Sequence, residues 1–164
     1  MLALDLGSKR VGVAVSDATA TLASPLATIE RSGDPSRDHH RVAALVAEED
    51  VGLVVVGLPT NMDGSAGPAA VAAEAEAEAL AAVLAGAAAV VLVDERLTTV
   101  TADRVLLARG QRAPARRRVV DQVAAAVLLQ GWLDGTGGRN WRAGALPGRT
   151  VGGHGPAGPD GRAR

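Results

Sequence analysis

The stretch ALDLGSKRVGVAVSD, residues 3–17, joins two short apolar runs through a turn that contains glycine, and it includes two carboxylates. The runs at residues 2–6 and 11–16 have the length and composition of β-strands, so together they predict a hairpin. Asp5 lies inside the first run, where removing an unpaired carboxylate from water costs several kcal/mol. A core strand is therefore expected to carry an acid at a position where an acid is costly.

Outside this hairpin, strand-like and helix-like segments alternate. Two nearly unbroken runs of small apolar residues, 51–58 and 89–93, are typical of parallel strands that are buried on both faces. Three hairpin-linked strands, followed by two strands reached through helices, predict an α/β fold with a five-stranded mixed sheet flanked by helices. The third strand is expected at residues 22–30, and helices are expected at 38–49, 69–84, 99–108 and 116–134.

The length of 164 residues suits one domain with its own core, which we expect at residues 1–134. In residues 135–164, 13 of 30 positions are Gly or Pro, so this tail is expected to be disordered or a basic arm whose deletion leaves folding intact. The chain has no Cys, which excludes disulfides and thiol catalysis. No apolar stretch has the length of a membrane span, so we expect a cytoplasmic protein without a membrane partner.

Acids occur at three places in the chain where burial is costly. Besides Asp5, these are the pair Asp94 and Glu95 at the end of the last strand, and Asp121 on an apolar face of the final helix. Adjacent strand residues face opposite sides of a sheet, so only one of Asp94 and Glu95 can join Asp5. Converging carboxylates repel unless a cation holds them, and hard divalent ions such as Mg²⁺ or Mn²⁺ bind carboxylate oxygens. Two such ions can activate a water and stabilise the leaving oxygen of a phosphodiester.

Each acid also has an ordinary structural interpretation. Asp5 can form a turn hydrogen bond to the backbone. Asp94 and Glu95 can be the solvated end of a strand, and Asp121 can pair with an Arg of residues 116–118. The joint occurrence of the three acids on elements that can pack together favours the metal site.

Basic side chains give a second indication. The net charge of −1 does not indicate whether the protein binds nucleic acid, so only local clusters of basic residues can indicate such binding. Arg116, Arg117 and Arg118 lie near the start of a helix, where the macrodipole disfavours cations, and phosphates nearby would explain them. A solvated charge run is the alternative. Because the chain has two Trp and no Phe or Tyr, base stacking has few partners, which favours recognition of nucleic-acid backbone and shape.

The loop PTNMDGSAGP, residues 59–68, leaves a buried strand and enters a helix, which is where α/β sheets bind ligands. Asn61, Asp63 and Ser65 make it a possible substrate loop, and an ordinary strand-to-helix connection is the alternative. His39 and His40 begin the first helix without other ligand-type residues nearby in sequence, so both are expected to be solvated.

Four sequence blocks occur in this order: ALDLGSKRVGVAVSD, VVVGLPTNMDGSAGP, VDERLTTVTA and VVDQVAAAVLLQGWLD. Together they closely resemble the YqgF/RuvX-like family over about residues 2–134. These are pre-16S rRNA nucleases related to Holliday junction resolvases. The resemblance implies an RNase H-like fold, a carboxylate site with two metal ions, and a role in maturing the 5′ end of small-subunit ribosomal RNA in the bacterial cytoplasm. It also implies that the acids are Asp5, Glu95 and Asp121, with Glu95 preferred over Asp94.

We therefore expect a metal-dependent nuclease that hydrolyses RNA phosphodiester bonds in ribosome biogenesis, using Mg²⁺ or Mn²⁺ held by Asp5, Glu95 and Asp121. A resolvase acting on branched DNA is an alternative, since the same site serves either substrate. A non-catalytic nucleic-acid-binding module is a further alternative, although it does not require three acids. The expected nucleic-acid contacts are Lys9, Arg10, Arg96, Arg116, Arg117 and Arg118.

Overall fold

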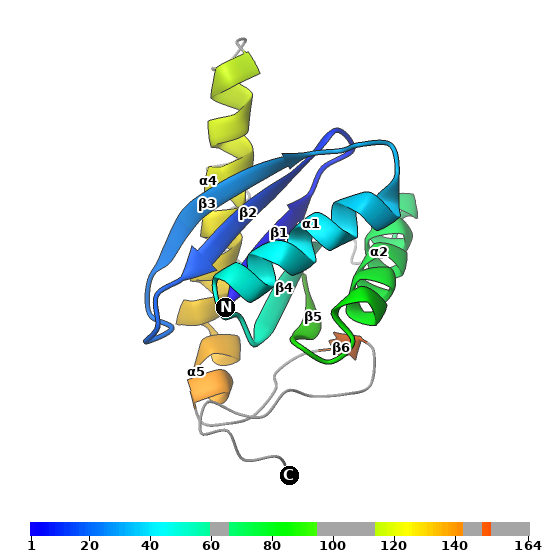
Figure 1. The fold of residues 1–164 in the computed structure, drawn as a ribbon. Coiled ribbons are helices and arrows are strands. Elements are labelled where there is room, and N and C mark those ends of the chain that lie inside the picture. Colours follow the sequence, from blue (N-terminus) through cyan, green and yellow to red (C-terminus); the bar gives the residue numbers. More distant parts are fainter. Residues whose placement is uncertain (60–65, 95–113, 143–148, 152–164) are drawn as a thin grey trace.

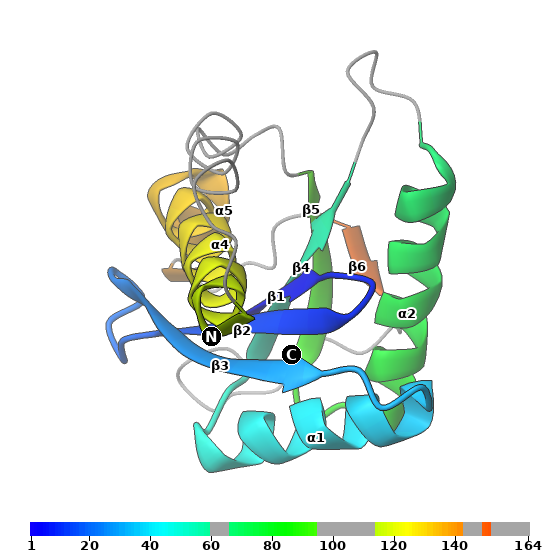
Figure 2. The ribbon, with the colours of Figure 1, turned by 90° about the horizontal axis from the view of Figure 1, so that it is seen from above.

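The computed structural model describes residues 1–59, 66–94, 114–142 and 149–151. Within these ranges the strands form one sheet, with α1 and α2 on one face (Figure 1) and α4 on the other (Figure 2). No helix in these ranges is both long and apolar enough to cross a membrane. The elements are β1 (Leu2–Leu6), β2 (Arg10–Ser16), β3 (Ala23–Glu30), α1 (Pro35–Glu48), β4 (Leu53–Leu58), α2 (Pro68–Leu84), β5 (Ala89–Asp94), α4 (Pro114–Asp134), α5 (Thr136–Arg142) and β6 (Arg149–Val151).

The mixed sheet confirms the predicted α/β fold. Strands β1 and β2 form the expected antiparallel hairpin, in which Asp5 is the cross-strand partner of Gly12. Strand β4 is parallel to β1, and β5 is parallel to β4, as expected for strands reached through helices. The expected number of five strands is wrong by one. Strand β6, from the tail, pairs antiparallel with β5, so the described sheet has six strands in the order β3-β2-β1-β4-β5-β6.

The two faces of the sheet pack against different helices. Toward α1 and α2, β1 presents the fully buried side chains of Leu2 and Leu4. Toward α4, β1 presents Ala3 and β2 presents Ala14. Large side chains on one face fill the space beneath two helices, whereas small ones on the other face allow a single helix to lie close to the hairpin.

Helix α1 begins before residue 38, where the apolar spacing alone puts its start. Asp34 is its N-cap, and the Asp34 carboxylate accepts hydrogen bonds from two backbone amides of the first turn. Pro35 follows at the first helical position, where its missing N–H costs nothing. The helix expected at residues 99–108 lies outside the described residues.

The tail contains regular structure where none was expected. Helix α5 packs against α4, and a Cβ added to Gly137 would lie 2.4 Å from the Trp132 indole nitrogen. A Cβ on Gly138 would lie 2.1 Å from the backbone oxygen of Leu133. Two of the glycines that suggested disorder are therefore residues that allow close packing, since any larger side chain at 137 or 138 would overlap with α4. Strand β6 adds pairing along the open edge of β5.

Deleting residues 135–164 is therefore expected to lower the free energy of unfolding, by about 2 kcal/mol, because it removes the α5 contact and the β6 pairing. This reverses the expectation from composition. Urea denaturation of the full chain and of two truncated chains measures the effect. The matched control lacks only residues 152–164 and keeps both α5 and β6. Equal unfolding midpoints for the two truncated chains would show that neither element contributes.

Candidate functional site

Asp5 lies on the face of the sheet that α4 covers. In β1, side chains alternate between the two faces: Ala3 packs in the core beneath α4, whereas Leu2 and Leu4 pack beneath α1 and α2. The same alternation puts Asp5 on the side of Ala3. Its side chain is neither fully buried nor fully exposed, because it stands near the end of β1 where the sheet meets solvent.

Asp121 comes to this position because α4 crosses β2 at a glycine. A Cβ added to Gly12 would lie 2.0 Å from the backbone oxygen of Asp121 and 3.3 Å from its Cα, so no other residue fits at position 12 without a shift of the helix. Gly12 is the cross-strand partner of Asp5. Two acids that are far apart in the chain therefore lie on the same face, around one glycine. Gly12 was not among the residues predicted for the site.

Arg10 forms an ion pair with Asp121, with 2.6 Å between the Nε of Arg10 and the Oδ2 of Asp121. Both side chains are partly buried, at 23% and 27% exposed, respectively. The structural alternative for Asp121 was an ion pair with an Arg of residues 116–118. The structure instead pairs Asp121 with Arg10, which is 111 residues away from it in the sequence. The pair shows that this position accommodates a positive charge between the helix and the hairpin.

The structure describes one of the two acids at the end of β5, Asp94. Val91 packs in the core beneath α4 and Leu92 in the core beneath α1 and α2, so Asp94 faces away from Asp5. Glu95, the other acid of this pair, lies outside the described residues. In the part of the chain that the structure describes, no group of three His, Cys, Asp or Glu residues is placed to hold a metal ion.

The remaining predicted contacts fall into two groups. Lys9 is exposed in the turn between β1 and β2, close in sequence to both Asp5 and Arg10. Residues 116–118 belong to α4 as helical backbone, and the structure describes none of their side chains. Arg96 and the possible substrate loop, which comprises Asn61, Asp63 and Ser65, lie outside the described residues.

Asp17, the second carboxylate of the opening stretch, has a purely local role. It accepts hydrogen bonds from the backbone amides of Leu22 (2.9 Å) and Thr21 (2.7 Å) and from the hydroxyls of Thr19 and Thr21. The hydrogen bond from the Leu22 amide, together with those from the threonines, lowers the pKa of Asp17. Asp17 therefore organises the turn that leads into β3, whereas Asp5 lies on the face of the sheet that α4 covers.

The expectation that both histidines are solvated is wrong for His39. His40 is exposed, but His39 is only 5% exposed, and its Nε2 has no hydrogen-bond partner among the described residues. His39 shares a helix face with the buried residues Val42 and Val46, at spacings of three and seven. That spacing was the signal in the sequence that could have predicted its burial.

Comparison with solved structures identifies the class of fold. T. thermophilus RuvC, solved in complex with a Holliday junction substrate, aligns with this chain at a TM-score of 0.50 and 14% sequence identity. The alignment covers 82% of this chain and 95% of that chain. At this level of identity the likeness concerns the fold alone, which is RNase H-like, as expected.

Sequence comparison then gives the family. The family model RuvX, described as Holliday junction resolvase, matches residues 1–135. A relative from Mycobacterium sp. (strain KMS), named "Putative pre-16S rRNA nuclease", is 46% identical over 94% of this chain and 87% of its own length. A relative of the same name from Pelotomaculum thermopropionicum is 41% identical over 98% of this chain and 97% of its own. The chain belongs to the RuvX family.

Proposed function

We propose that the protein is a metal-dependent nuclease that hydrolyses phosphodiester bonds in structured RNA, with the precursor of 16S rRNA as its substrate. One observation carries the proposal: α4 packs on Gly12 with the backbone of Asp121, beside the cross-strand position of Asp5. Membership of the RuvX family and relatives named for pre-16S rRNA nuclease activity support it.

The donor set fits a hard divalent ion. Asp5 and Asp121 offer carboxylate oxygens on one face, and Arg10 shows that a cation is accommodated beside Asp121. We propose that Asp5, Asp121 and Glu95 hold Mg²⁺ or Mn²⁺. Such an ion supplies charge stabilisation to the phosphate and makes water a better nucleophile.

The chain's own residues supply binding and orientation. Lys9 is exposed on the turn that joins the strand of Asp5 to the strand of Arg10, where its ammonium group can contact a backbone phosphate. Arg10 neutralises Asp121, which keeps two acids from repelling each other before the substrate arrives. The N-terminal turns of α4 extend beyond the sheet (Figure 1), and residues 116–118, which belong to these turns, are the proposed phosphate contacts on this helix.

The test compares two substrates under the same conditions. Purified protein is incubated with a precursor RNA that spans the 5′ end of 16S rRNA, or with a four-way DNA junction, in Mg²⁺, in Mn²⁺ and in chelator. We expect metal-dependent cleavage of the RNA. Cleavage of the junction in preference to the RNA would favour resolution of branched DNA, which the description of the family model supports as the second candidate. Binding without cleavage under any divalent ion would favour a non-catalytic module.

Phosphate contact by Lys9 makes a quantitative prediction. In chelator, where no RNA is cut, Lys9→Gln is expected to weaken RNA binding and to reduce the slope of log K against log salt by about 1, because one counterion fewer is released. Fluorescence anisotropy at several salt concentrations measures both effects. The matched control is Arg37→Gln, which removes an exposed charge on α1, on the other side of the sheet. Identical slopes for the two variants would remove Lys9 from the interface.

A further inference from the structure

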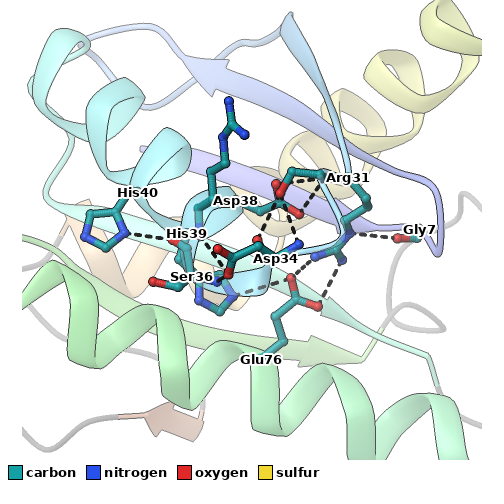
Figure 3. Close-up of polar contacts among 10 residues, drawn as sticks. Gly7, Arg31, Asp34, Ser36, Asp38, His39, His40 and Glu76 are labelled. Carbon is teal, nitrogen blue, oxygen red and sulfur yellow. Dashed lines mark hydrogen bonds and ion pairs between the residues drawn. The ribbon is translucent and has the colours of Figure 1, made fainter.

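A cluster of charged side chains lies between the two helices that cover the far side of the sheet from the carboxylates. Arg31 follows β3, Asp38 and His39 belong to α1, and Glu76 belongs to α2 (Figure 3). Asp38 is only 3% exposed, and Arg31 and Glu76 are 18% and 21% exposed at their side chains. Charged groups with so little exposure are normally held by specific partners.

Arg31 contacts the turn between β1 and β2 at two carbonyls. Its Nε donates to the oxygen of Gly7 (3.2 Å), and its backbone amide donates to the oxygen of Lys9 (3.0 Å). The turn itself is tight, since a Cβ on Gly7 would lie 2.6 Å from the oxygen of Arg10. Arg31 therefore holds both ends of the three-residue segment that follows β1 and carries Lys9.

Glu76 fixes the orientation of the Arg31 guanidinium. Its two carboxylate oxygens accept hydrogen bonds from the two terminal nitrogens of Arg31, which makes the pair bidentate: Nη1 donates to Oε1, and Nη2 donates to Oε2 at 2.9 Å. The Nε of Arg31 is left free to point at Gly7. The Nε2 of His39 lies 3.6 Å from Glu76 on the other side (Figure 3), so the carboxylate is enclosed between α1 and the arginine.

Asp38 strengthens the same arrangement. Burial raises the pKa of Asp38. Hydrogen bonds from Ser32 and the positive charges of Arg31 and Arg41 together lower the pKa by more than burial raises it, so the net shift is downward. Asp38 stays ionised near Arg31 and accepts hydrogen bonds from the Ser32 amide at 3.1 and 3.2 Å. The cavity beside the cluster measures ≈ 10 Å³, too small for a nucleotide, so the cluster is not a second substrate site.

We propose that Arg31 and Glu76 are positioning residues for the nuclease site: anchored on α2 through Glu76, Arg31 holds the turn that carries Lys9 and joins the strands of Asp5 and Arg10. This proposal rests on the proposed function for its catalytic meaning. The connection runs from a helix on one face of the sheet, through two backbone carbonyls, to the side chains on the other face. Neither residue touches the substrate.

The experiment replaces Glu76 with Gln. The substitution keeps the shape of the side chain, but it turns one acceptor of the arginine fork into a donor, so the bidentate pair cannot form. We expect faster amide exchange at Gly7 and Arg31, whose amides donate hydrogen bonds at this turn. We also expect cleavage slowed about tenfold at saturating RNA, since small displacements of positioning groups cost rate. The matched control, Glu78→Gln, makes the same change at an exposed position of α2 and is expected to behave as the wild type.

A merely structural role for Glu76 would lower the melting temperature without changing the folded protein, so all assays are run well below the transition. A double-mutant cycle of Glu76→Gln with Lys9→Gln, measured as RNA affinity in chelator, tests whether Glu76 acts through the turn that carries Lys9. If Glu76 acts through the turn, the two losses are less than additive. Additive losses, or exchange rates for Glu76→Gln equal to those of Glu78→Gln, would overturn the proposal.

Failure of the proposed function is distinguishable from failure of this inference. A wild-type protein that neither binds nor cuts nucleic acid removes the function, and the amide exchange of Gly7 and Arg31 still decides whether Glu76 positions the turn. An active wild type, with Glu76→Gln equally active and equally protected from exchange, removes the positioning role alone.

Discussion

An Asp5→Asn variant is expected to cleave the precursor RNA about 10²- to 10³-fold more slowly than the wild type, while keeping its fold. The substitution removes the charge of one proposed metal ligand and preserves its volume. Because Asp5 stands near the end of β1 and is not fully buried, the neutral amide should be tolerated in the sheet. Cleavage rates over a titration of Mg²⁺ and Mn²⁺, with calorimetry of metal binding to the same protein, measure the effect.

Asp17→Asn is the matched control for this prediction. It makes the same change in the same hairpin, but Asp17 only accepts hydrogen bonds within its own turn, so its loss is expected to leave cleavage unchanged. The comparison separates a catalytic role from any general effect of removing negative charge near β2. Equal cleavage by Asp5→Asn and the wild type would remove the proposed mechanism, whatever the control shows.

A Gly12→Ala variant is expected to lose about 3 kcal/mol of unfolding free energy, a large effect for one methyl group. The added Cβ would lie 2.0 Å from the backbone oxygen of Asp121, and a backbone atom cannot relieve the overlap by a change of rotamer, as a side chain can. The helix must shift as a whole, away from β2. Urea denaturation measures the loss, and the cleavage rate of the protein that remains folded reports whether Asp121 moved with the helix.

Gly33→Ala separates this contact from the general cost of replacing glycine. Gly33 has φ +84, and no heavy atom lies within 4 Å of its added Cβ, so the variant bears only the backbone cost of a left-handed conformation, about 1 kcal/mol. Losses of equal size in the two variants would show that α4 yields easily at Gly12. The tight approach would then not be what holds Asp121 beside Asp5.

Local patterns were sufficient to predict most of the fold. Alternation and composition located the hairpin and the two Val-rich strands, because a strand buried on both faces needs a continuous apolar run. The same reasoning failed for the tail, because glycine signals both a flexible chain and a close contact. Only a neighbour such as Trp132, packed against Gly137, decides between the two.

The sequence by itself determined that acids stand where burial is costly, because hydrophobic periodicity and residue type are both local properties. Tertiary structure alone decided which of them meet. The contact of Gly12 with Asp121, the ion pair from Arg10 and the anchor from Glu76 to Arg31 all join residues that are distant in the chain. Such pairings depend on how closely a helix can approach a sheet, and packing of whole elements sets that distance.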